Sequence, residues 1–115
     1  MSLRKKQSEF AKCIGELIHY AYQQGYELTF GDAFRDTRVF GEFGNKKSYS
    51  HKNSVHKIRL AVDFNLFVNG EFIQNGDHQA YQELGEFWKT LHSDARWGGD
   101  FNDANHFSFT HWGAK

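Results

Sequence analysis

Two histidines and two aspartates of this chain have the types and spacing of a hydrolytic metal centre. His56 stands seven residues before Asp63, and Asp103 stands three residues before His106. Imidazole nitrogens and carboxylate oxygens are ligands that Zn²⁺ prefers, and catalytic zinc sites combine three protein ligands with a water. A further carboxylate can take the proton of that water. The pattern favours a small zinc hydrolase, with His56, Asp63 and His106 as metal ligands and Asp103 as the general base.

This hypothesis makes a structural demand and has simpler alternatives. Seven residues of extended chain span about 23 Å, so a turn or bulge around 57–59 must bring His56 back toward Asp63. Taken alone, Asp63 fits a strand whose outer face is exposed to water. Asp103 and His106 alone also fit an Asx-type turn, in which the carboxylate only bonds the local backbone. The argument for a metal centre therefore depends on the combination of the two segments.

Arg35 is the candidate for stabilising negative charge at the same site. It stands in the turn Gly-Asp-Ala-Phe-Arg-Asp after a short predicted strand. Hydrolysis of an amide builds negative charge on the carbonyl oxygen, which a fixed guanidinium beside the metal would stabilise. The alternative is an ordinary surface ion pair with Asp32 or Asp36.

The remaining candidates have less support from spacing. His51 and His111 flank the proposed ligand regions, and we predict contacts with the substrate or with the ligands for them. Cys13 lies on the apolar side of a predicted helix, which indicates core packing rather than a nucleophile. Three further histidines fall within or beside predicted helices and have no partner at ligand spacing: His19, His78 and His92.

Size and composition indicate one soluble domain over residues 1–115. The formal net charge is zero, so nothing in the charge argues for a nucleic-acid or membrane partner. A single cysteine excludes an internal disulfide and fits a reducing compartment. No segment has a signal-peptide core or the roughly 18–20 apolar residues that span a bilayer. We expect a monomer made in the cytoplasm, which needs outside help for any later export.

The hydrophobic pattern predicts an α+β fold with a mostly antiparallel sheet and two main helices. Apolar residues recur at three- and four-residue steps in two stretches, the second capped by Asp77. In other stretches apolar and polar residues alternate, which is the pattern of a β-strand. Asn69-Gly70 is a strong hairpin signal. The predicted elements are helices over 2–24 and 77–92, strands over 26–30, 58–68, 71–73, 97–99 and 106–110, and a surface loop over 37–53.

The combined motifs resemble the D-alanyl-D-alanine carboxypeptidase family of zinc peptidases, which includes VanY- and VanX-type enzymes and phage L-alanyl-D-glutamate endopeptidases. The segments that carry the resemblance are Ser54-Val55-His56 with Ala61-Val62-Asp63, and Asp103-Ala104-Asn105-His106-Phe107. The family pattern is S-x-H-x-x-G-x-A-x-D, followed by a carboxylate three positions before a histidine. The stretch from Trp97 to Phe101 also looks like the phage branch.

The resemblance implies a hedgehog/D-Ala-D-Ala peptidase-like fold with zinc on His56, Asp63 and His106. It places the base on Asp103 and the family's arginine on Arg35. We also expect Ser54 and His51 to contact substrate. Two positions depart from the usual pattern. Arg59 replaces the glycine of the first motif, which leaves the conformation of the turn before Asp63 open. An aspartate at 103, where VanX-type enzymes have glutamate, favours the endopeptidase branch.

The function implied by this resemblance is hydrolysis of the stem peptide of bacterial peptidoglycan. We expect an L-Ala–D-Glu endopeptidase of phage or prophage origin, which acts in lysis and reaches the cell wall through a holin-type pore. One alternative is a D-Ala–D-Ala carboxypeptidase or dipeptidase. Another is a non-catalytic domain that binds the cell wall and uses the metal only for stability. Asp103 distinguishes an enzyme from this wall-binding domain, because a purely structural metal site needs no carboxylate beyond those of its ligands.

Overall fold

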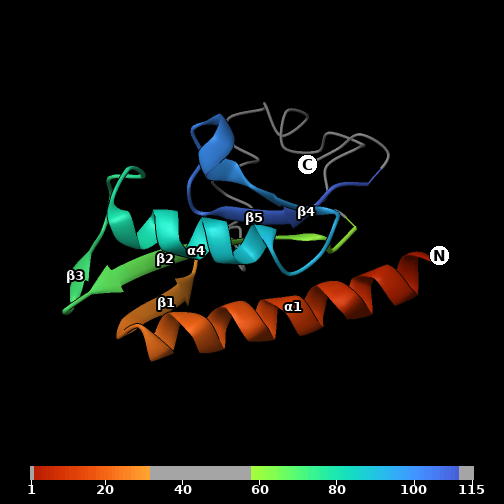
Figure 1. The fold of residues 1–115 in the computed structure, drawn as a ribbon, viewed down its shortest axis with the longest axis horizontal. Coiled ribbons are helices and arrows are strands. Elements are labelled where there is room, and N and C mark those ends of the chain that lie inside the picture. The colour runs from red at the N-terminus through yellow and green to blue at the C-terminus, as the bar shows by residue number, and fades with distance from the viewer. Residues whose placement is uncertain (1, 32–57, 112–115) are drawn as a thin grey trace, which may run out of the picture.

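The computed structural model describes residues 2–31 and 58–111. In these residues an antiparallel sheet has the strand order β1-β2-β5-β4, and β3 pairs with the end of β2. The α+β class is confirmed (Figure 1). The elements are α1 (Leu3–Gln23), β1 (Tyr26–Phe30), β2 (Ala61–Val68), β3 (Glu71–Phe72), α4 (Gln79–Lys89), β4 (Ala95–Trp97), the 3₁₀ turn η1 (Gly98–Phe101) and β5 (His106–Phe109).

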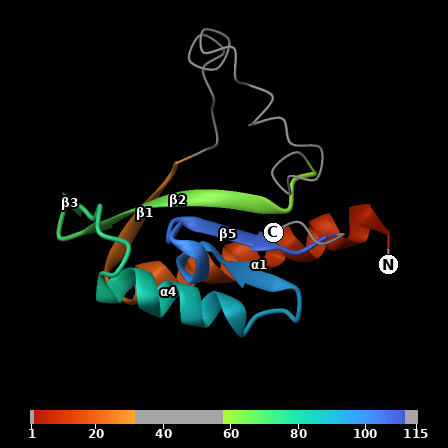
Figure 2. The ribbon, with the colours of Figure 1, turned by 90° about the horizontal axis from the view of Figure 1, so that it is seen from above.

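Helices α1 and α4 lie side by side against one face of the sheet (Figure 2). Trp88 of α4 is fully buried between them and the sheet. Its ring meets Phe10 of α1 edge to face at 5.7 Å and Phe109 of β5 at 5.6 Å. Cys13 belongs to the same core, as its position on the helix predicted. The burial of these aromatic side chains fixes which face of the sheet is closed by helices.

The ends of the helices follow local capping chemistry. The Ser2 side chain accepts a hydrogen bond from the Lys5 amide at 3.1 Å, and Gly25 follows α1 with a φ of 87°, the left-handed stop that glycine favours. The prediction that Asp77 caps the second helix was wrong. His78 is the N-cap, and its Nδ1 accepts from the Ala80 amide at 3.0 Å. Within 2–31 and 58–111, neither helix combines the length and apolar character that crossing a membrane requires.

Two predicted strands begin or end at the wrong place. The strand predicted over 58–68 begins only at Ala61, because Ile58 and Arg59 form a turn. The strand predicted over 97–99 is shifted, since β4 covers Ala95–Trp97 and the glycines after it enter η1. The strand predicted over 106–110 is nearly correct. Both errors lie beside the proposed metal centre, where the chain turns rather than extends.

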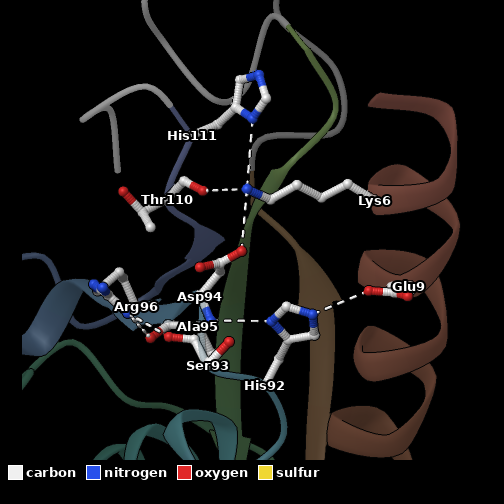
Figure 3. A network of polar contacts seen from close by, with 9 residues as sticks. All are labelled: Lys6, Glu9, His92, Ser93, Asp94, Ala95, Arg96, Thr110 and His111. Atoms are coloured by element: carbon white, nitrogen blue, oxygen red, sulfur yellow. Dashed lines mark hydrogen bonds and ion pairs between the residues drawn. The ribbon is translucent and has the colours of Figure 1, made fainter. Parts of the chain in front are cut away.

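A network of polar contacts holds the first half of α1 against the end of the sheet (Figure 3). Lys6 Nζ lies 3.2 Å from Asp94 Oδ2 and donates to the Thr110 carbonyl at 2.6 Å. His92 Nδ1 accepts from the Asp94 amide, so its Nε2 carries the ring proton and donates to Glu9 at 3.0 Å. These contacts hold two segments against α1: the residues just before β4 and the residues that follow β5. Strand β5 begins with His106, a predicted metal ligand.

Candidate metal centre and active site

Asp63 and His106 face each other across two neighbouring strands. In the antiparallel pairing of β2 with β5, Asp63 is directly opposite His106, and such partners point to the same side of a sheet. Asp63 Oδ1 lies 3.0 Å from His106 Nδ1. Their side chains are only 15% and 8% exposed. The neighbours Phe64 and Phe107 point into the helical core instead, so this polar pair occupies the face away from the helices.

The chemistry and spacing of this pair suit a metal ion. A carboxylate oxygen and an imidazole nitrogen are both zinc ligands, with bonds of about 2.0–2.2 Å. The observed 3.0 Å between the two atoms is close to the separation of two donors that share one tetrahedral ion. Within residues 2–31 and 58–111, no group of three or more potential ligand side chains lies together. The third predicted ligand, His56, lies outside the described residues.

The turn that the metal hypothesis requires is present where β2 begins. Ile58 and Arg59 form a turn immediately before Leu60 and the strand. Arg59 has a φ of 59°, in the left-handed region that glycine enters without strain. The resemblance places a glycine of the family pattern at this position. Arg59 therefore adopts, despite its Cβ, a backbone conformation that a glycine at this position would adopt without strain.

Asp103 is placed by a tight loop built on Gly98. The Asp103 amide donates to the Gly98 carbonyl at 2.7 Å, and the His106 amide donates to the Asp103 carbonyl at 2.9 Å. A Cβ on Gly98 would meet the Asp103 carbonyl oxygen at 1.9 Å and His106 Cβ at 2.7 Å. Only glycine fits there. Asp103 itself is exposed, so the loop presents a solvent-accessible carboxylate three residues before the buried imidazole.

Side chains of helix α4 and of β4 also hold the loop from Gly98 to His106 in place. Lys89 Nζ lies 3.1 Å from Asp100 Oδ2 and 3.1 Å from Glu86 Oε2. The hydrogen bond with Glu86 raises the pKa of Lys89 above its usual value; burial opposes this rise, and the contact with Asp100 adds to it. The Trp97 indole N–H donates to the Ala104 carbonyl at 2.7 Å. These contacts limit the freedom of the segment that carries Asp103.

One residue of this loop was not predicted to have a role. Phe101 is 43% exposed, yet its ring lies edge-on to the His106 ring with 6.1 Å between centroids. Apart from its place in the Trp97–Phe101 stretch that looks like the phage branch, the sequence signal was an aromatic residue within a run of glycine, aspartate and asparagine. That signal is weak, because an isolated exposed aromatic side chain is common on protein surfaces.

The other predicted residues divide into two groups. His78 and His92 have structural roles, one as a helix cap and one in the network of Figure 3. His111 Nδ1 lies 3.5 Å from Lys6 Nζ in that network. The remaining predicted site residues lie outside the described residues: Arg35, His51, Ser54 and His56.

Two comparisons with known proteins give a match. The crystal structure of Serratia marcescens L-Ala D-Glu endopeptidase ChiX is similar, with a TM-score of 0.64 and 18% identity over 90% of this chain and 79% of that one. At this identity the likeness shows the fold. No curated protein sequence matches the chain. The family model described as D-alanyl-D-alanine carboxypeptidase matches residues 48–109, more than half of the 115 residues, including Asp63, Asp103 and His106. The chain therefore belongs to the D-alanyl-D-alanine carboxypeptidase family of peptidases.

Proposed function

We propose that this protein is a zinc peptidase that cleaves the stem peptide of bacterial peptidoglycan at L-Ala–D-Glu. The single observation that carries the proposal is the Asp63–His106 pair, 3.0 Å apart and nearly buried, with the exposed Asp103 on a tight loop beside it. Membership of a peptidase family supports the reaction class. The name of the structural neighbour supports the choice of bond.

The residues have separate tasks in this proposal. Asp63 and His106, together with His56, would hold the zinc. Bound zinc would polarise the scissile carbonyl and lower the pKa of a bound water to about 7. Asp103 accepts the proton of the attacking water and then delivers it to the leaving amine. Arg35 stabilises the negative charge that develops on the carbonyl oxygen.

Two other functions predict different products. The family description names D-alanyl-D-alanine as the substrate of a carboxypeptidase, which supports cleavage at D-Ala–D-Ala as the second candidate. The dipeptides in the family description and in the name of the structural neighbour, D-alanyl-D-alanine and L-Ala D-Glu, both begin with an alanyl residue. A non-catalytic wall-binding domain has less support, because the loop from Gly98 to His106 fixes an exposed Asp103 that a purely structural metal would not need. A lytic role, release through a holin-type pore and a monomeric state stay predictions from the sequence.

Digestion of purified peptidoglycan tests the proposal. The purified protein is incubated with the polymer, and the released fragments are identified by mass spectrometry. New N-terminal D-Glu supports the endopeptidase, and release of D-Ala indicates the carboxypeptidase. The matched control is protein treated with a chelator and then reloaded with Zn²⁺, which should lose the activity and regain it. Binding of the wall without any cleavage would contradict an enzymatic role.

A further inference from the structure

The exposed ring of Phe101 lies beside the proposed metal centre and has no part in the proposed catalytic roles. The aromatic side chains of the core are almost fully buried, whereas Phe101 is 43% exposed. It nevertheless touches the site, because its ring lies edge-on to the imidazole of His106, with 6.1 Å between centroids and 61° between planes. It therefore presents apolar surface to solvent directly beside a proposed metal ligand.

The backbone around Phe101 is restricted. Gly98 fits only without a Cβ, and Asn102 follows in the left-handed conformation with a φ of 64°. Asp100, the preceding residue, is held by Lys89 at 3.1 Å. A ring on a restrained backbone loses little conformational entropy when a ligand packs against it, which is the advantage of preorganisation in binding.

We infer that Phe101 forms the apolar wall of the subsite for the alanyl residue on the N-terminal side of the cleaved bond. This inference rests on the proposed function. Of the two residues at an L-Ala–D-Glu bond, only the alanyl methyl gains by leaving water against a phenyl ring. The carboxylate of D-Glu would lose hydration there without gaining a partner. Phe101 is thus a specificity-determining residue.

Two synthetic peptides that differ only in that residue, L-Ala–D-Glu and Gly–D-Glu, measure the contact. In the wild-type protein the methyl should raise kcat/KM by about 10-fold, the lower end for one carbon group in an apolar pocket. In Phe101→Ala the preference should fall to about 2-fold as the wall is removed, and Phe101→Leu should restore most of it. Zinc content, measured by elemental analysis, should stay at the wild-type value in both variants.

Phe72 provides a matched control, because it is 44% exposed and lies on β3, paired with Phe67 at the far end of β2. Phe72→Ala should keep the wild-type preference for alanine. If Phe101→Ala fails to fold, Phe101→Asn places a turn-forming polar residue there and should show the same reduced preference.

Three outcomes would overturn the inference. If the Phe101 variants lose rate equally on both peptides, or lose zinc, the ring only shields His106. If the wild-type protein cleaves both peptides equally well, the alanyl subsite does not exist while the proposed function still holds. If the wild-type protein, loaded with zinc, cleaves neither these peptides nor peptidoglycan, the proposed function fails and the inference fails with it.

Discussion

Asp63 and His106 stand 43 positions apart in the chain and are directly opposite each other in the pairing of β2 with β5. Their meeting depends on strand register, because a slip of one residue would turn either side chain to the other face of the sheet. The large aromatic neighbours Phe64 and Phe107 oppose such a slip, since both are buried against the helices. The hydrophobic core thereby specifies the geometry of the polar site.

Gly98→Ala should damage both stability and activity. The added Cβ would lie 1.9 Å from the Asp103 carbonyl oxygen, so the backbone must move. We expect the free energy of unfolding to fall by about 1–3 kcal/mol, as for other overpacked sites. A shift of Asp103 of about 1 Å should lower kcat by about 10²-fold. Urea denaturation and peptide hydrolysis measure the two effects.

Gly15→Ala is the matched control for that variant. Gly15 lies within α1, and its added Cβ would have no atom within 4 Å. Replacing glycine by alanine in a helix interior should raise the free energy of unfolding by about 0.5–1 kcal/mol. If the two alanine variants behave alike, the close packing of Gly98 is not what holds the loop.

Asp103→Asn should separate catalysis from metal binding. The amide cannot take a proton from water, so turnover should fall by about 10²-fold or more. Zinc content should stay unchanged, because Asp103 is not a proposed ligand. Asp77→Asn is a suitable control, since Asp77 is also exposed and lies before α4. Full activity in Asp103→Asn would remove this residue as the general base.

Arg59→Gly should stabilise the protein slightly. Arg59 has a φ of 59°, and a left-handed backbone costs a residue with a Cβ about 1–2 kcal/mol. Glycine relieves that strain but makes the unfolded chain more flexible, at a cost of about 0.4–1 kcal/mol. The expected net gain is about 0.5–1 kcal/mol, read from the urea midpoint at constant m-value. A destabilised variant would show that the arginine side chain has a role of its own.

The Tyr26–Glu83 hydrogen bond should make stability fall at high pH. This bond, followed by burial, raises the pKa of Tyr26 from 10.0 to about 12. The folded state then holds the phenolic proton more strongly than the unfolded state. The contribution is therefore complete below pH 10 and is lost as the pH rises to about 12. Tyr26→Phe should show a shallower decline across this window in urea titrations at stepped pH; an identical decline would contradict the assignment.

Periodicity in the sequence predicted the elements far from the site well. The helix over 2–24, the strand over 26–30 and the hairpin at Asn69-Gly70 agree with α1, β1 and the β2–β3 turn within a few residues. In these segments local propensity and burial favour the same structure. The alternation that placed Asp63 on a different face from Phe64 was also correct, as the pairing with His106 shows.

Predictions from the sequence were less accurate where tertiary contacts determine the backbone conformation. The hydrophobic pattern predicted a strand through Arg59, because its neighbours are apolar; only the metal hypothesis required a turn around 57–59. A strand was also predicted over 97–99, although Gly98 owes its place to the close approach of Asp103 and His106. The His78 cap replaced Asp77 for a different, local reason, since either side chain can accept the hydrogen bond and cap preference alone favoured the aspartate.

Zinc content of two ligand variants tests the central claim most directly. Wild-type protein, Asp63→Ala and His106→Ala are loaded with Zn²⁺, freed of excess metal and measured by elemental analysis. His19→Ala serves as the control, because His19 is an exposed histidine on α1. We expect about one zinc ion per chain in the wild-type and control proteins, and loss of the ion from both ligand variants while they remain folded by circular dichroism. Undiminished zinc in Asp63→Ala and His106→Ala would contradict the claim that these two side chains hold the metal.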